Sequence, residues 1–248
     1  MSYSPNPMRR FFISAQQREN SAVILTGSEA HHLANVLRLQ AQDQVEFIDG
    51  SGRILVSRLE RVTPNKVEAT VVEERLERVE TPFPITLLMG VLKGKKMELV
   101  IQKATELGVH QVLPVHTRFC AFQAQGEKQQ RRWQRIMVEA CKQCKRTQPM
   151  SILPITRFEQ VDFSQFTHKV VGWEKEHSGR LTPGTFHTPG PVCIGIGPEG
   201  GWHENEITHL LDKAFLPVTL GPHILRGETA AIAATAIVQN MLRLNADT

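Results

Sequence analysis

The chain has 248 residues, of which 41% are hydrophobic and 22% are charged, and its formal net charge is +4. These values are typical of a soluble globular protein, and no segment is apolar over the length that predicts a membrane-spanning helix. Four cysteines do not indicate a disulfide framework, and the N-terminus lacks the apolar core of a secretory signal. We therefore expect a cytoplasmic protein, with two domains favoured over one long domain.

Positive charge is concentrated in the middle of the chain. Residues 93–146 carry 12 Lys and Arg against 4 Asp and Glu, whereas residues 1–80 carry 10 against 11 and residues 147–248 carry 7 against 10. Such a cluster attracts a polyanion, and the commonest polyanion in a cytoplasm is a nucleic-acid phosphate backbone. A solvated helix face would give the same run of charge, so both interpretations stay open here.

The first part of the chain, residues 1–76, is predicted to be a small β-rich domain. Apolar and polar residues alternate in short stretches, and Asn, Asp, Gly and Pro mark the turns. The predicted strands are RRFFIS, SAVILT, DQVEFIDG, RILVSRLE and KVEATVVEE. One helix is predicted in SEAHHLANVLRLQ, where Leu33 and Leu37 share a face, and Thr26 with Glu29 has the spacing of a capping box.

A second domain, residues 77–248, is predicted to begin near Pro82 and Pro84. The apolar run ITLLMGVL is typical of a strand covered on both faces, as in a parallel sheet. Helices and strands then alternate through KKMELVIQKATELG, VHQVLPVH, EKQQRRWQRIMVEACKQCKR, HKVVGWE, PVCIGIG, HENEITHLLDKA, LPVTLG and ETAAIAATAIVQNMLRL, which predicts an α/β fold. The last helix is apolar on nearly every side, so we expect its own domain or a second subunit to cover it.

A glycine-rich turn, IGIGPEGG, joins one predicted strand to the next helix. Gly195, Gly197 and Gly200 match the dinucleotide pattern G-x-G-x-x-G. However, Pro198 removes a backbone donor, and no acidic residue lies about 20 positions further on. Glu199 would also repel a pyrophosphate. The turn therefore favours a ligand that is neutral or partly cationic, and no P-loop motif occurs elsewhere in the chain.

A second turn, LGPHILRGETAA at residues 220–231, also leaves a strand through glycine and enters a helix. Two such turns at the carboxyl ends of nearby parallel strands would enclose one pocket. S-adenosylmethionine, a sulfonium with an adenine edge to recognise, meets the requirements of both turns. Two tight loops that only need positive φ would give the same pattern, so this alternative stays open.

At these stretches the sequence resembles the SPOUT class of RNA methyltransferases, and within it the RsmE family. The resemblance runs in order from residue 9 to residue 231, through RRFFI, HHLANVLRL, KGKKMELVIQKATELGV, EACKQCKR, IGPEGGWHENEI and LGPHILRGETAA. It implies a PUA-like or OB-like β-barrel that binds RNA, an α/β domain with a C-terminal trefoil knot, and a homodimer. It also implies methylation of N3 of a uridine in 16S ribosomal RNA of the small ribosomal subunit, with S-adenosylmethionine as cofactor.

The resemblance implies a cofactor site built mainly from the two glycine turns. Removing the N3 proton leaves negative charge on the uracil, and a fixed cation stabilises it, so Arg226 is the candidate catalytic residue. Its alternative role is a salt bridge to Glu228 or Glu199. Glu106 is the candidate general base, with a solvated carboxylate as the alternative. The expected cofactor-binding residues are Leu88, Gly90, Ile196, Gly197, Pro198, Glu199, Gly200, Gly201, Leu220, Gly221, Ile224, Leu225, Thr229 and Ala230.

Basic and aromatic residues supply the candidates for RNA contact. Trp133 and Trp202 suit either base stacking or packing in the core. Cys141 and Cys144 form a C-x-x-C without a second pair at metal-ligand spacing, so we expect neither a metal site nor redox chemistry. The candidates for phosphate contact are Arg9, Arg10, Arg38, Lys93, Lys95, Lys96, Arg118 and Arg146.

Three other functions stay open from the sequence. A ribosome-associated RNA-binding protein without catalysis would share the basic middle, and a nicotinamide-dependent oxidoreductase would use GIGPEG. Another SPOUT enzyme, acting on a base or a ribose 2′-O of ribosomal or transfer RNA, is the nearest rival. One departure from the family pattern is that Gln42 and Asp43 stand where a Gly-Asp turn is expected.

Overall fold

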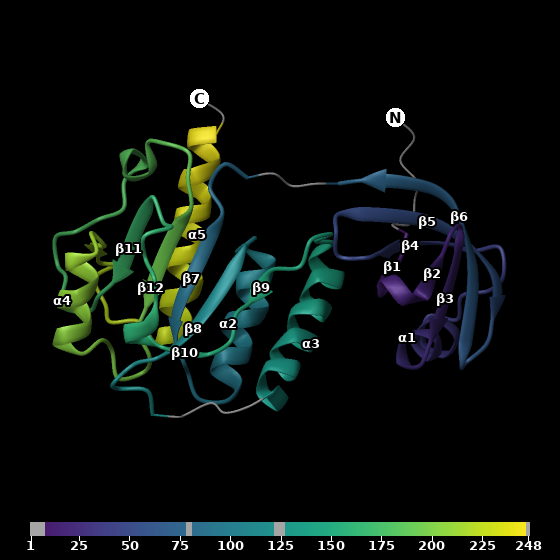
Figure 1. Ribbon diagram of the computed structural model, residues 1–248, viewed down its shortest axis with the longest axis horizontal. Helices are drawn as coiled ribbons and strands as arrows, with labels where there is room; N and C mark the ends of the chain where they lie inside the picture. Colours follow the sequence, from purple (N-terminus) through teal and green to yellow (C-terminus); the bar gives the residue numbers. More distant parts are fainter. Residues whose placement is uncertain (1–7, 78–80, 122–126, 247–248) are drawn as a thin grey trace. The chain divides into compact units, whose positions relative to one another are not determined.

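The computed structural model describes residues 8–77, 81–121 and 127–246 (Figure 1). The chain divides into two compact units. The first contains the residues before 81 together with Cys141–Gln148, and the second contains Thr81–Ala140 and Pro149–Thr248. The domain boundary predicted between residues 76 and 77 lies beside residues 78–80, which are outside the described ranges, and it stays a prediction.

The first unit is built on one six-stranded sheet, in the order β1-β4-β5-β6-β3-β2. Only β1 and β4 pair in parallel, and the other neighbours are antiparallel. The alternation in the sequence produces this sheet, because one face of each strand is buried. The strands are β1 (Arg10–Phe12), β2 (Arg18–Glu19), β3 (Ala22–Thr26), β4 (Gln44–Ile48), β5 (Arg53–Val62) and β6 (Lys66–Leu76).

The helix of the first unit differs from its prediction. It has one α-helical turn, α1 (Ser28–His31), which continues as a π-helix, η2 (His32–Val36). Gly27 is the N-cap, at φ 70° and without a side-chain cap bond, so the Thr26–Glu29 capping box is wrong. The glycine starts the helix one residue later than the pattern assumed, and Glu29 accepts a hydrogen bond from Lys142 Nζ at 2.6 Å instead.

The turn before β4 contains a left-handed backbone conformation at a residue that is not glycine. Gln42 lies in the left-handed region at φ 77°, which non-glycine residues seldom adopt. Its backbone N–H donates to Leu59 O at 2.7 Å, and Asp43 Oδ2 accepts from Gln40 N at 2.7 Å. These hydrogen bonds hold the turn, so the departure from a Gly-Asp pair leaves the local fold intact.

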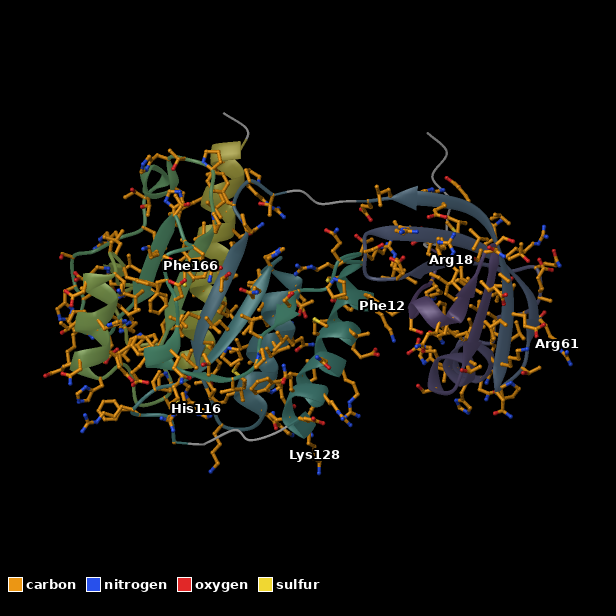
Figure 2. All side chains as sticks on the ribbon, viewed as in Figure 1. Phe12, Arg18, Arg61, His116, Lys128 and Phe166 are labelled. Carbon is orange, nitrogen blue, oxygen red and sulfur yellow. The ribbon has the colours of Figure 1, made fainter. Side chains whose placement is uncertain are left out.

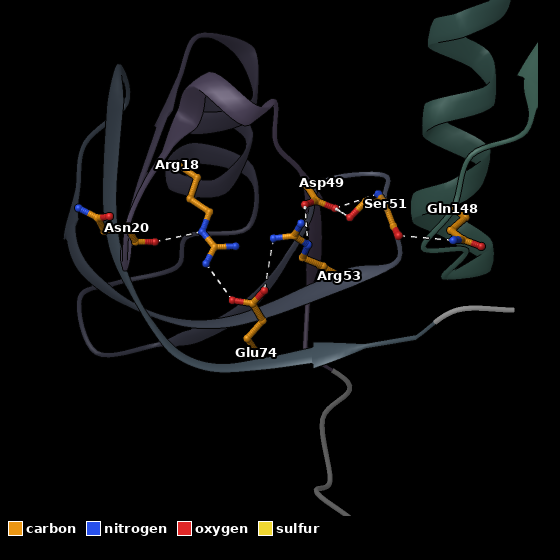
Figure 3. A network of polar contacts seen from close by, with 7 residues as sticks. All are labelled: Arg18, Asn20, Asp49, Ser51, Arg53, Glu74 and Gln148. Atoms are coloured by element: carbon orange, nitrogen blue, oxygen red, sulfur yellow. Dashed lines mark hydrogen bonds and ion pairs between the residues drawn. The ribbon is translucent and has the colours of Figure 1, made fainter.

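Arg18 and Arg53 of the first unit form ion pairs with neighbouring carboxylates (Figure 3). Glu74 accepts from Arg18 Nη2 at 2.8 Å and lies 3.7 Å from Arg53 Nη1, while Asp49 lies 3.8 Å from Arg53 Nε. Asp49 also accepts from Ser51, and these interactions hold the pKa of its carboxyl below the usual value against the opposing effect of burial. Arg18 and Arg53 are thus partly neutralised by carboxylates.

The second unit has a seven-stranded sheet in which every pair is parallel, and this confirms the predicted α/β class. Six strands follow the order β10-β8-β7-β12-β11-β13, and β9 pairs with β8. The apolar runs fill the centre, since every residue of β7 and of β12 is buried. The strands are β7 (Ile85–Gly90), β8 (Gln111–His116), β9 (Ser151–Ile152), β10 (Thr156–Arg157), β11 (His168–Gly172), β12 (Val192–Ile196) and β13 (Leu216–Val218).

The α-helices α2 (Lys95–Glu106), α4 (Glu204–Asp212) and α5 (Gly227–Ala246) lie in this unit, and α3 (Glu127–Cys144) begins in it, while its last residues group with the first unit. In Figure 1, α5 runs beside β7 and β12, with which it is in contact, and it also packs on α2. On α4, Ile207 and Leu210 join a core cluster with Leu88 and Val171. Within the described residues, no helix is long and apolar enough to cross a membrane.

Candidate functional site

Three neighbouring strands of the second unit end level with one another. The register aligns Gly172, at the end of β11, with Ile196 of β12 and with Val218 of β13. All three residues line a cavity of about 460 Å³. Ligands of open parallel sheets bind at the carboxyl ends of the strands, and small-molecule sites commonly measure roughly 300–1,000 Å³.

Both glycine turns line this cavity. Three of the expected cofactor-binding residues lie outside the lining: Leu88 is a core residue, Thr229 is exposed on α5, and Gly90 lies behind the first turn. The expected residues that do line the cavity are Ile196, Gly197, Pro198, Glu199, Gly200, Gly201, Leu220, Gly221, Ile224, Leu225 and Ala230.

Sequence reasoning missed a third wall of the cavity. It follows β11 and consists of Gly172, Trp173, Glu174, Glu176 and His177. The available signal was a glycine at the carboxyl end of a predicted parallel strand, followed by a polar loop. The sequence predicts only a strand in HKVVGWE, because the position of the following loop beside β12 and β13 depends on a strand order that the chain order does not reveal.

Glu199 ties the first glycine turn to the start of α2. Its Oε1 accepts from the backbone N–H of Lys93 at 3.2 Å and from Lys96 Nζ at 3.1 Å. Partial burial raises the pKa of the Glu199 carboxyl, but these hydrogen bonds outweigh burial and hold the pKa below its usual value. The carboxylate of Glu199 is therefore ionised, and it forms an ion pair with the ammonium of Lys96.

The third wall adds two more carboxylates to the lining. Glu174 lies against Gly201, where an added Cβ would be 2.6 Å from Glu174 Oε1. Glu176 accepts from the backbone N–H groups of Gly179 and Ser178, both at 2.7 Å, and from the Ser178 hydroxyl at 2.8 Å. Those hydrogen bonds lower the pKa of Glu176 to about 2. The third wall is consequently acidic and suits a cationic group.

We expect Glu176 to make stability depend on pH in a defined window. A pKa lowered from the ordinary 4.5 to about 2 stabilises the fold fully above pH 4.5, and the effect disappears as pH falls towards 2. Thermal denaturation of wild type and of Glu176→Gln should show a Tm difference at pH 6 that shrinks by pH 3. A difference independent of pH would contradict this assignment.

Arg226 lies on the cavity wall, one residue before α5 begins. The side chain is exposed, and no ion pair reaches it from residues 8–77, 81–121 or 127–246. The two alternative salt bridges are not formed, since Glu199 pairs with Lys96 and Glu228 Oε2 is buried without a hydrogen-bond partner. The guanidinium is therefore free to meet a ligand.

Glu106, the candidate general base, has a different environment. It ends α2, lies outside the cavity lining, and forms an ion pair with Lys103 at 2.8 Å. The cavity gives this assignment no support, and it stays a prediction.

The candidate RNA-binding residues divide between the two units. In the first unit, Arg9 and Arg38 are exposed, whereas Arg10 forms an ion pair with Glu46 at 2.8 Å and is only 12% exposed. Arg146, whose segment groups with the first unit, is half-buried and donates to Gln148 O at 2.6 Å. In the second unit the exposed candidates are Lys93, Lys95 and Arg118.

The cysteines and tryptophans are mainly structural. Burial raises the pKa of the Cys141 thiol to about 11, so this sulfur is protonated at neutral pH. In the described part of the chain, no group of three or more His, Cys, Asp or Glu side chains is arranged to hold a metal ion. Trp133 and Trp202 are buried at 1% and 5% exposure, and both belong to the core.

Comparisons with known proteins define the class of this fold and cavity. The family model described as "RNA methyltransferase domain" matches residues 79–239, and the model described as "RNA methyltransferase PUA domain" matches residues 25–72. The second unit thus has the fold of RNA methyltransferases of the SPOUT class, and its knot stays a prediction. The chain belongs to the ribosomal RNA small subunit methyltransferase E family.

Individual relatives cover nearly the whole chain. The proteins named ribosomal RNA small subunit methyltransferase E from Synechocystis and from Bacillus subtilis are 33% and 30% identical, over 94% and 96% of this chain and 78% and 98% of theirs. The Neisseria gonorrhoeae protein of that name, solved with bound S-adenosyl methionine, is 31% identical with a TM-score of 0.81, over 94% of this chain and 98% of its own. A putative methyltransferase from Legionella pneumophila was solved with the same cofactor. It is 28% identical with a TM-score of 0.86, over 95% of this chain and 98% of its own.

Proposed function

We propose that this protein transfers a methyl group from S-adenosylmethionine to N3 of a uridine in 16S ribosomal RNA of the small ribosomal subunit. The observation that carries the proposal is the cavity of about 460 Å³ at the carboxyl ends of β11, β12 and β13. Two similar structures, at 31% and 28% identity, were solved with this cofactor bound. The assignment of ribosomal RNA of the small subunit as substrate rests on the name of the family. The assignment of the N3 position rests on the resemblance to the RsmE family.

The lining fits the cofactor in size and in charge. Backbone-rich turns at 196–202 and 218–227 would hold the adenosyl part, because glycines let a ligand approach the main chain closely. The carboxylates of Glu174 and Glu176 would stabilise the positive charges of the sulfonium and the amino group. Glu199 accepts hydrogen bonds from Lys93 and Lys96, so it holds the first turn in place and does not face the ligand as a free charge.

The cofactor supplies an activated methyl and its own leaving group. The protein's part is to orient the uracil and to stabilise the charge that develops when N3 loses its proton. Arg226 is our candidate for that task, because it lines the cavity with an exposed guanidinium that forms no ion pair with the described residues. Lys93, Lys95 and Arg118 of the second unit, with Arg9 and Arg38 of the first, are the exposed cations offered to RNA phosphates.

A homodimer is part of the proposal. Helix α5 remains apolar where it is not covered by its own unit, with Ile237 36% exposed and Leu244 56% exposed. Ile224, in the second glycine turn, is 81% exposed. A second copy of the chain would bury these side chains, and sedimentation equilibrium at micromolar concentration should give twice the chain mass.

Isothermal titration calorimetry with S-adenosylmethionine and with NAD tests the cofactor assignment. We expect S-adenosylmethionine to bind and NAD not to bind, because Glu174 and Glu176 of the lining would attract a sulfonium and repel a pyrophosphate. Binding of NAD alone would favour an oxidoreductase. Binding of neither compound would leave an RNA-binding protein without catalysis as the better description.

A further inference from the structure

One aromatic side chain is both exposed and held against the glycine turn of the cavity. Phe119 follows the end of β8, marked by His116 in Figure 2, and 45% of its surface is exposed. It packs directly on Gly200, where an added Cβ would lie 2.7 Å from Phe119 Cβ. Its ring also lies against the imidazole of His203, with 5.4 Å between the ring centroids. Since Gly200 lines the cavity, the exposed ring borders the proposed reaction site.

The backbone that carries Phe119 is fixed by a buried carboxylate. Glu206, only 5% exposed, accepts from the backbone N–H of Arg118 at 2.8 Å and, through its other oxygen, from the N–H of His203 at 2.8 Å. Cys120 N–H donates to Thr117 O at 3.2 Å, which closes the turn. The loop after β8 is therefore bound to the start of α4, and the ring is held in place before any partner arrives.

The charges around the ring favour RNA as its partner. Arg118, the residue before Phe119, is exposed, and so is Lys93, whose backbone N–H donates to Glu199, the residue before Gly200. Proteins that bind single-stranded nucleic acids combine an exposed aromatic ring with nearby cations. Bases stack on the ring, and phosphates contact the cations. Trp133 and Trp202, the tryptophans that the sequence offers for stacking, cannot serve this purpose, because both are buried.

We propose that Phe119, backed by His203, is a stacking platform for an unpaired base of the RNA substrate at the border of the cofactor cavity. The inference rests on the proposed function, since it takes the RNA to be the molecule that reaches this edge. The role is positioning: the ring orients the RNA and takes no part in bond making. Arg118 would contact a phosphate next to the stacked base.

Three substitutions at one position separate stacking from packing. Phe119→Ala removes the ring, Phe119→Leu keeps an apolar side chain over Gly200 without a π-face, and Phe119→Tyr keeps the ring. Leu211→Ala is the matched control, because Leu211 is another exposed apolar residue of the same unit, 42% exposed on α4. The readouts are fluorescence anisotropy with a labelled single-stranded oligouridylate, calorimetry with S-adenosylmethionine, and sedimentation equilibrium.

We expect Phe119→Ala and Phe119→Leu each to lose roughly tenfold in affinity for the oligouridylate, and Phe119→Tyr and Leu211→Ala to keep it. Affinity for S-adenosylmethionine and the oligomeric state should not change. Three results would overturn the proposal: full RNA affinity in Phe119→Leu, an equal loss of cofactor affinity, or dissociation of the oligomer. The last result would assign the ring to a subunit contact.

The same measurements keep this proposal separate from the proposed function. A wild-type protein that does not bind S-adenosylmethionine would contradict the methyltransferase assignment. A ring-dependent loss of oligouridylate binding in that protein would still support the stacking platform.

Discussion

Gly90→Ala should weaken binding of S-adenosylmethionine about 10- to 100-fold. Gly90 ends β7, and an added Cβ would lie 2.5 Å from Pro198 N and 2.9 Å from the carbonyl carbon of Gly197. Both atoms belong to the backbone of the first glycine turn, so a flexible side chain cannot relieve the clash. Overpacking of this kind costs about 1–3 kcal/mol, and each 1.4 kcal/mol is a factor of ten in affinity. Calorimetry measures the change.

The matched control for this substitution is Gly184→Ala. Gly184 lies in a short 3-10 helix of the same unit, η4 (Pro183–Phe186), and the nearest atom to an added Cβ is 4.0 Å away. We expect it to bind the cofactor as wild type does. Circular dichroism should show that Gly90→Ala is folded at the temperature of the titration. Wild-type affinity in folded Gly90→Ala would refute the view that the first turn forms the cofactor site.

Arg226→Ala should lower kcat for methyl transfer about 100- to 1,000-fold while leaving the affinity for S-adenosylmethionine nearly unchanged. A fixed donor at the place where negative charge develops acts mainly on the transition state, and removal of one such donor has an effect of this size. Arg226→Lys should recover part of the rate, since it restores the charge without the planar fork. Single-turnover assays with labelled cofactor and small ribosomal subunits provide the measurement.

Arg157→Ala is a suitable control for the loss of one positive charge. Arg157 is exposed on β10, at the edge of the same sheet, and does not line the cavity. Its rate should match wild type. If Arg226→Ala lost cofactor affinity in proportion to its rate, the guanidinium would be a ligand of the cofactor, and the proposed stabilisation of the uracil would be wrong.

Much of the second unit was predictable because its local patterns are strong. The apolar run that contains β7 and the amphipathic stretch of α2 specify their own structure, and both glycine turns line one cavity. The short strands β9 and β10 were missed, since two residues carry no periodicity. The helix after Gly27 began late, because a glycine N-cap at positive φ replaced the side-chain cap that the spacing suggested.

The remaining features depend on contacts between distant segments. Gly90 stays a predicted cofactor contact, and its lack of a side chain makes room for Pro198. Gly200 was expected to contact the cofactor; it lines the cavity, and a side chain there would also meet Phe119. The wall after β11 joins the site because β11 lies between β12 and β13. Spacing along the chain does not encode this order, so sequence reasoning alone finds two of the three walls.

Identification of the methylated nucleoside tests the central claim most directly. Small ribosomal subunits that lack the modification would be incubated with the protein and methyl-labelled S-adenosylmethionine, and their RNA digested to nucleosides for chromatography and mass spectrometry. We predict that the label appears in 3-methyluridine, and that it appears about 100- to 1,000-fold more slowly when Arg226→Ala replaces wild type. Label on a ribose 2′-O, or no transfer to RNA at all, would contradict the account.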